Sequence, residues 1–156
     1  MPSIQINIGD HASARVGWIA IPAKYRPVTS WARVRAKRIA REIPSADTYF
    51  KSLPYGRSLT ALLADSTIWI NYEPLNNAYG WANGKEIAMC KMSYDVGRWT
   101  VLGTLIHELA HVNGASGRRS STTAEEALFH CGLGNRNEFS TGVDDPKTPY
   151  DPNIGG

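Results

Sequence analysis

The sequence has no long apolar run and few cysteines, and both features restrict the class of protein. It contains no stretch of the 18 or more continuous apolar residues that a membrane-spanning helix needs. Residues 1–10 lack the basic start and apolar core of a secretory signal, so export would require a dedicated secretion system. No repeat, low-complexity tract or linker divides the 156 residues. We therefore expect one domain over residues 1–156, with an irregular tail from about residue 133.

The two cysteines, Cys90 and Cys131, belong to no Cys-x-x-Cys pair, which excludes a zinc site built mainly from thiolates. They could form one disulfide in an oxidising compartment or remain buried thiols, and the sequence leaves both readings open.

Charged residues make up 20% of the chain and give a formal net charge of +3. The basic residues gather in one segment, as Arg33, Arg35, Lys37, Arg38 and Arg41. We interpret them as the solvated side of an amphipathic helix. No nucleic-acid-binding motif accompanies them, so we expect no nucleic-acid partner.

Hydrophobic periodicity predicts an α+β fold. We expect strands near residues 4–8, 16–21, 67–72, 79–81 and 85–92, and helices over residues 30–43, 58–64, 97–112 and 122–131. Asn83-Gly84 favours a hairpin, so the middle strands should form a meander in a small, mostly antiparallel sheet. The five tryptophans, at positions 18, 31, 69, 81 and 99, are expected to build the core rather than a binding cleft.

The segment 97–112 is the most informative, because apolar residues surround most of its circumference and predict a buried central helix. Asp95 is placed to cap its start, and Asn113-Gly114 to end it in a left-handed turn. Within it lies His107-Glu108-Leu109-Ala110-His111, an HExxH motif.

The HExxH motif predicts a zinc site with hydrolytic chemistry. Residues four apart share one helix face, so His107 and His111 can reach one metal ion, and imidazole nitrogen suits Zn²⁺. Glu108 can then accept a proton from a zinc-activated water and pass it to the leaving amine. Two imidazoles and a carboxylate would be expensive on an apolar helix without such a partner.

A catalytic zinc site needs a third protein ligand. The acidic and histidine candidates after the motif are Glu125, Glu126, His130, Glu138, Asp144 and Asp145. In the expected helix 122–131, Ala124, Ala127, Leu128 and Cys131 share the inward face; Glu125 flanks that face, and Glu126 points nearly opposite. Glu125 is therefore the predicted third ligand, with Glu126 and His130 as alternatives.

An HExxH helix followed by a glutamate helix resembles the gluzincin group of metallopeptidases, over roughly residues 85–133. More narrowly, His107–Gly114 with residues 124–128 and Cys131-Gly132 looks like the small metallopeptidase toxin domains of bacterial secretion systems. The metzincin pattern fails, because position 117 is Gly117 rather than His. The Thr-x-Asp that follows HExxH in aspzincins is also absent, although residues 141–145 echo it distantly.

The resemblance implies a zincin-like fold, a zinc cofactor and a protein or peptide substrate bound as an added strand along a sheet edge. Residues 80–84 or 85–92 are the expected edge. An oxyanion-stabilising donor is also expected, with Tyr94, Tyr150, His130 and Arg98 as unranked candidates. A delivered toxin or effector would further have secretion machinery and a cognate immunity protein as partners.

The motif specifies the catalyst rather than the substrate, so other functions remain open. One is a zinc amidase that acts on cell-wall peptide or another amide. Another is an intracellular peptidase with a regulatory partner. A third is a non-catalytic domain in which zinc only stabilises the fold, and a closed fourth coordination position would support it.

Overall fold

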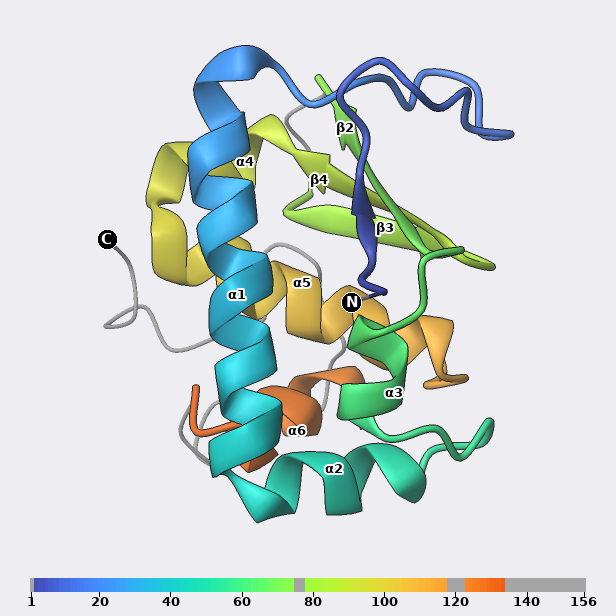
Figure 1. The fold of residues 1–156 in the computed structure, drawn as a ribbon, viewed down its shortest axis with the longest axis vertical. Helices are drawn as coiled ribbons and strands as arrows, with labels where there is room; N and C mark the ends of the chain where they lie inside the picture. Colours follow the sequence, from blue (N-terminus) through green and yellow to red (C-terminus); the bar gives the residue numbers. More distant parts are fainter. Residues whose placement is uncertain (1, 75–77, 118–122, 134–156) are drawn as a thin grey trace.

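The computed structural model describes residues 2–74, 78–117 and 123–133, in which helices pack against one four-stranded sheet (Figure 1). The strands are β1 (Gln5–Ile6), β2 (Trp69–Glu73), β3 (Gly80–Asn83) and β4 (Glu86–Cys90), in the order β1-β2-β4-β3. β1 pairs with β2 and β2 with β4 in parallel, and only β3 and β4 are antiparallel. The expected α+β class is confirmed, but the sheet is mixed rather than mostly antiparallel.

Burial explains why the expected meander is wrong. The expected hairpin does form, but its turn residues are Gly84 and Lys85, because Asn83 is the last residue of β3 and pairs with Glu86. β4 then returns between β2 and β3, because its residues 87–90 are all buried and need neighbours on both sides. β3 carries only one buried residue, Gly80, and occupies the edge.

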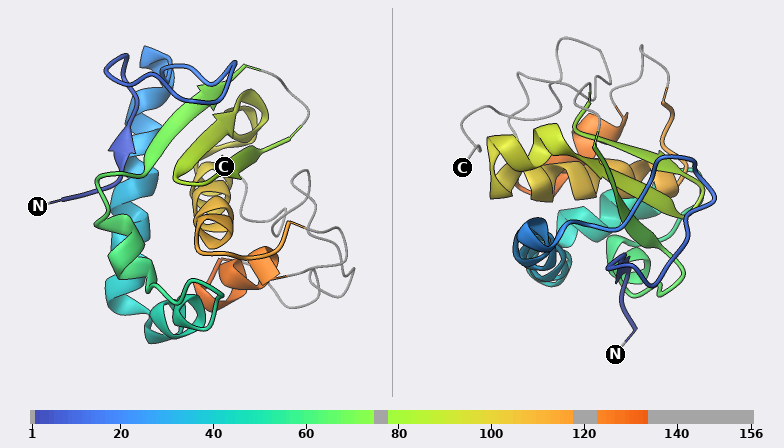
Figure 2. Two further views of the ribbon diagram at one scale, coloured as in Figure 1. Left: turned by 90° about the vertical axis from the view of Figure 1, so that its right-hand side faces the viewer. Right: turned by 90° about the horizontal axis from the view of Figure 1, so that it is seen from above.

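The helices are η1 (Ala23–Tyr25, 3₁₀), α1 (Arg26–Glu42), α2 (Pro44–Lys51), α3 (Leu59–Leu63), α4 (Lys91–Val96), α5 (Arg98–Val112) and α6 (Thr123–His130). α5 contacts α1, α4, α6, β3 and β4, so it is the central helix. α2 and α6 lie near the C-terminal end of α1, away from the sheet, whereas α3 adjoins the start of β1, where the Ile4 N–H donates to the Leu63 carbonyl (Figures 1 and 2). Across the described ranges, no helix has the length and apolar character to cross a membrane.

The expected helix 58–64 is confirmed as α3, where the Ser58 side chain caps the first turn by accepting from the Ala61 N–H. The helix expected from residue 30 begins earlier, at Arg26, because Pro27 is well tolerated in a first turn. Pro44 ends α1 as expected and also starts α2 by the same rule.

Three expectations for other segments of the chain are wrong. Residues 16–21 form no strand: they contribute one isolated bridge, from Ile19 to Tyr72, and Val16 is fully exposed. The strand expected to run to Met92 stops at Cys90, where α4 begins. Asp95 therefore lies inside α4, where it pairs with Lys91 at 2.8 Å, and does not cap α5.

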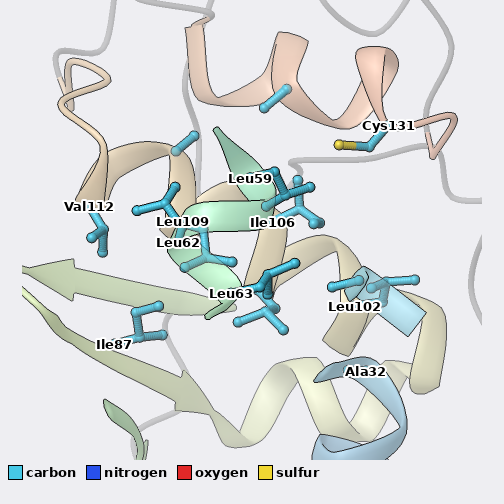
Figure 3. Packing of buried hydrophobic residues seen from close by; sticks show 14 of the residues in the cluster. Ala32, Leu59, Leu62, Leu63, Ile87, Leu102, Ile106, Leu109, Val112 and Cys131 are labelled. Atoms are coloured by element: carbon cyan, nitrogen blue, oxygen red, sulfur yellow. The ribbon is translucent and has the colours of Figure 1, made fainter. Parts of the chain in front are cut away.

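One apolar core joins the sheet to the helices. Figure 3 shows Leu59, Leu62 and Leu63 of α3 beside Leu102, Ile106 and Leu109 of α5, and all six are buried members of one cluster. Cys90 and Cys131 are also buried, and both thiols are free, so the structure forms no disulfide between them. The tail expected from residue 133 lies almost wholly outside the described residues.

Candidate metal centre

The candidate centre is built on α5, which is buried on nearly every side, as expected from its sequence. Twelve of its 15 residues are buried, including His107 and Glu108 at 3% exposure each, and His111 is half-buried. Burial leaves the side chains of His107 and Glu108 with little access to water. Their arrangement therefore has to supply its own partners.

The two histidines point their Nε2 atoms at one another, at a separation of 3.2 Å. The Nδ1 atom of His111 lies 2.9 Å from the carbonyl oxygen of Ala115. A carbonyl oxygen can only accept, so Nδ1 of His111 carries the hydrogen and its Nε2 presents a lone pair when the ring is neutral. The backbone turn after α5 thus fixes the tautomer of His111.

That turn is held by Asn113 and Gly114. The fully buried Asn113 donates from Nδ2 to the carbonyls of Phe50 and Arg57, each at 2.8 Å. Its Oδ1 accepts from the Arg57 backbone N–H at 3.2 Å. Gly114 adopts φ 95°, and a Cβ there would lie 2.9 Å from that of Pro54. The end of α5 is therefore fixed to the segment that follows α2.

Glu108 lies on the side of α5 that faces β3. A Cβ built on Gly80 would meet Thr104 Cγ2 at 2.5 Å, the Ala88 carbonyl oxygen at 2.9 Å and Glu108 Cγ at 3.4 Å. Only glycine allows this strand to approach the helix so closely. Gly80 thereby brings the backbone of β3 alongside the side chain expected to act as the base.

A cavity of about 310 Å³ opens over these residues. Of the described residues, His107, Glu108 and His111 line it on the helix side and Gly80, Trp81 and Ala82 on the strand side. Ala115 and Gly117 also line it. The HExxH side chains and the β3 backbone therefore face one shared space.

The residues fit a zinc ion by three criteria. Two nitrogens bound to one tetrahedral Zn²⁺ at about 2.0–2.1 Å lie about 3.3 Å apart, which matches the Nε2 separation in this structure. One potential ligand atom from each of His107, Glu108 and His111 lies within 4.8 Å of the other two. The donor set, two imidazoles beside a carboxylate, also suits zinc chemically.

Glu125 lies close to this group, but on its far side. It is 3% exposed, and its Oε1 is 3.2 Å from Nδ1 of His107, the ring atom opposite Nε2. A carboxylate in this position is typical of one that orients a metal-binding histidine. Glu125 as a direct third ligand therefore stays a prediction. Its expected neighbours on the inward face, Ala124, Ala127, Leu128 and Cys131, are all buried as predicted.

The structure places the alternative ligands elsewhere. The His130 ring stacks on Tyr49 of α2, with ring centroids 4.4 Å apart. Glu126 is half-buried, and its charge adds to the burial that raises the pKa of Tyr49. Both residues thus lie toward Tyr49. Glu138, Asp144 and Asp145 lie outside the described residues.

None of the described oxyanion candidates lines the cavity. The Tyr94 hydroxyl is 2.7 Å from the Thr29 hydroxyl, and the Arg98 guanidinium lies over Trp31. His130 stacks on Tyr49, as described above, and Tyr150 lies outside the described residues. The prediction of an oxyanion donor among these side chains gains no support.

Sequence reasoning also missed two contributors to the site. Trp81 is 38% exposed and lines the cavity, which corrects the expectation that it belongs to the core. Trp31 and Trp99 do pack against the core, as expected. Gly80 was recognised only as part of a possible edge segment, because its close approach to α5 depends on the tertiary structure.

The chain matches no family model, no curated protein and no solved structure.

Proposed function

We propose that this chain is a zinc-dependent peptidase. The observation that carries the proposal is the convergence of the His107 and His111 Nε2 atoms beside Glu108, in a cavity whose other wall is a strand edge. A structural zinc site would be closed by protein ligands. Here the described residues leave a cavity of about 310 Å³ next to the histidine pair, which favours catalysis.

His107 and His111 would hold the metal, and the Glu125 carboxylate would complete or brace that set. Zinc bound there supplies a Lewis acid that polarises the scissile carbonyl and lowers the pKa of water. Glu108 lines the same cavity and takes the proton from the attacking water, then delivers it to the leaving amine. The buried apolar residues of α5 lower the local dielectric constant and so strengthen these charge interactions.

The strand side of the cavity supports an extended peptide as the substrate. The Cys90 N–H donates to the Tyr79 carbonyl at 2.9 Å, next to the registered pair Gly80 and Met89. Because hydrogen-bonded and non-hydrogen-bonded pairs alternate in an antiparallel ladder, Gly80 and Ala82 direct their N–H and C=O groups away from β4. Within the described ranges β3 has a strand on one side only, so these groups can pair with an added strand.

The proposal is tested with a mixture of unstructured peptides incubated with zinc-loaded protein and analysed by mass spectrometry. We expect cleavage by the wild type and none by Glu108→Gln, which should still bind zinc. Asn83→Ala is the matched control, because Asn83 is exposed and does not line the cavity. Peptides left intact by the zinc-loaded wild type would contradict a peptidase function.

The toxin or effector role is a further proposal, supported by the local resemblance of the HExxH and glutamate segments. Wild type and Glu108→Ala should be expressed in bacteria, both in the cytoplasm and directed to the periplasm. We expect growth arrest by the wild type in one compartment and normal growth with Glu108→Ala. Equal growth in every case would count against a toxin.

A further inference from the structure

Among the described residues that line the cavity, Trp81 is the one that is both large and apolar. Its side chain points to the face of the sheet opposite α5, because side chains alternate along a strand and Gly80 faces α5. The indole is 38% exposed on an edge strand, so part of its apolar surface is accessible to a binding partner. Its position beside the candidate catalytic residues suggests that the partner is the substrate.

The indole is anchored on this face of the sheet. Cys90 lies two residues beyond Ala88, the partner of Trp81 in the register, and so sits diagonally across on the same face. Burial raises the pKa of the Cys90 thiol to about 12, and a hydrogen bond from Trp81 acts in the opposite direction. Since indole can only donate, its N–H is directed to the buried sulfur. The apolar part of the ring is then free to contact a ligand.

The geometry of the strand ladder identifies the substrate residue that would lie opposite Trp81. A peptide added antiparallel to β3 forms hydrogen-bonded pairs at Gly80 and Ala82. The residue between them lies opposite Trp81 in a non-hydrogen-bonded pair, where side chains approach most closely. Its side chain projects to the face that carries the indole. The two flanking substrate residues direct their side chains toward α5.

We infer that Trp81 is a specificity-determining residue, which selects an aromatic or branched aliphatic side chain at the substrate position paired with it. This inference rests on the proposed peptidase function. Aromatic and β-branched cross-strand pairs are favourable, and covering the exposed indole removes further apolar surface from water. We expect a preference of roughly tenfold in affinity over a small polar side chain at that position.

The test is a binding selection on the catalytically disabled Glu108→Gln protein, loaded with zinc. A randomised peptide mixture is captured and sequenced. We expect enrichment of aromatic or branched aliphatic residues at one position, lost in Glu108→Gln/Trp81→Ala and kept in Glu108→Gln/Asn83→Ala, since Asn83 shares the face but lies outside the cavity lining. Trp81→Phe should keep most of the enrichment. A preference for basic or acidic residues, or one that survives Trp81→Ala, would overturn the inference.

Measurements of peptide hydrolysis distinguish the role of Trp81 from the peptidase function on which it rests. In wild-type background, Trp81→Ala should raise KM for peptides with the selected residue and leave kcat nearly unchanged, because the indole contacts substrate away from the reacting atoms. If the wild type cleaves peptides with no preference that depends on Trp81, the specificity role of Trp81 is wrong and the peptidase function is supported. Enrichment by Glu108→Gln without any cleavage by the wild type would keep Trp81 as a binding residue and remove the peptidase.

Discussion

The carboxylate of Glu125 lies against the ring of His107, with Oε1 3.2 Å from Nδ1, and both side chains are buried. The contact joins α6 to α5 at the first histidine of the motif. Glu125 could be a direct metal ligand or a residue that orients His107. These two roles predict different effects of a substitution at Glu125.

Substitutions at Glu125 should distinguish these roles by zinc affinity. If Glu125 orients the His107 ring, Glu125→Gln should weaken zinc binding about 10–100-fold, which is the usual effect of losing such a partner. The Co²⁺-substituted protein should then keep the d–d absorption bands of the wild type. Loss of a direct ligand would change the number and type of donors, and the Co²⁺ spectrum would change with it. Glu126→Gln is the control on the same helix and should alter neither measurement.

Gly80→Ala should detach β3 from α5. The added methyl group would meet Thr104 Cγ2 at 2.5 Å and the Ala88 carbonyl oxygen at 2.9 Å. Overpacking of this kind costs about 1–3 kcal/mol, and we expect that loss in urea unfolding, with peptide cleavage reduced more than zinc binding.

Gly117→Ala is the matched control, since Gly117 lines the same cavity and a Cβ there has nothing within 4 Å. Equal stability and activity in the two alanine variants would show that β3 does not depend on its close contact with α5.

Asn113→Ala should destabilise the chain by more than an ordinary substitution. The variant leaves the carbonyls of Phe50 and Arg57 without the amide that now donates to both. The hydrogen bond to Phe50 is buried and the one to Arg57 is partly buried, and a buried group that loses its partner costs about 1–3 kcal/mol. Chemical denaturation should show a loss in that range, whereas the exposed Asn83→Ala should stay within about 0.5 kcal/mol of the wild type. A loss for Asn113→Ala as small as that control would be inconsistent with the anchoring role.

Much of this site could be predicted from the sequence, because its central features are local. The HExxH spacing, the apolar circumference of residues 97–112 and the Gly114 stop depend on residues within one helix, and the structure places all of them as expected. The inward face of α6 followed from the same helical period, including the burial of Glu125. The metal and the chemistry that the motif indicates stay predictions until zinc is measured.

The errors concern relationships between distant segments. The insertion of β4 between β2 and β3 is determined by its burial on both faces, which a hairpin signal alone does not report. The same holds for Trp81: its exposure depends on β3 being the edge strand. The error at Asp95 is instead local, because this residue lies within α4 and pairs with Lys91 four residues earlier, rather than capping α5.

The stability of the fold should fall in acid partly because of Asp65, which follows α3. Burial acts to raise the pKa of Asp65, but hydrogen bonds from Thr67, Arg57 and Lys85 outweigh it and hold that pKa well below its usual range. A carboxyl group with a depressed folded-state pKa stabilises the fold above its unfolded pKa of about 3.9, and the contribution is lost as pH falls from there.

Asp65→Asn should therefore be less stable than the wild type at pH 7, and the difference should shrink at pH 3, as measured by urea unfolding at both values. The exposed pair of Asp95 with Lys91 provides the control, since Asp95→Asn should change little at either pH. A stability difference for Asp65→Asn that is independent of pH would rule out the ionised carboxylate as its source.

The most direct test of the account is the zinc content of the purified, zinc-loaded chain beside that of His111→Ala, measured by plasma mass spectrometry after dialysis. We predict about one zinc per chain in the wild type, because the two Nε2 atoms are 3.2 Å apart and suited to one tetrahedral ion. His111→Ala should lose it, and Glu108→Gln should keep it. A wild type that retains no zinc, or a His111→Ala variant that retains all of it, would contradict a metal centre on α5.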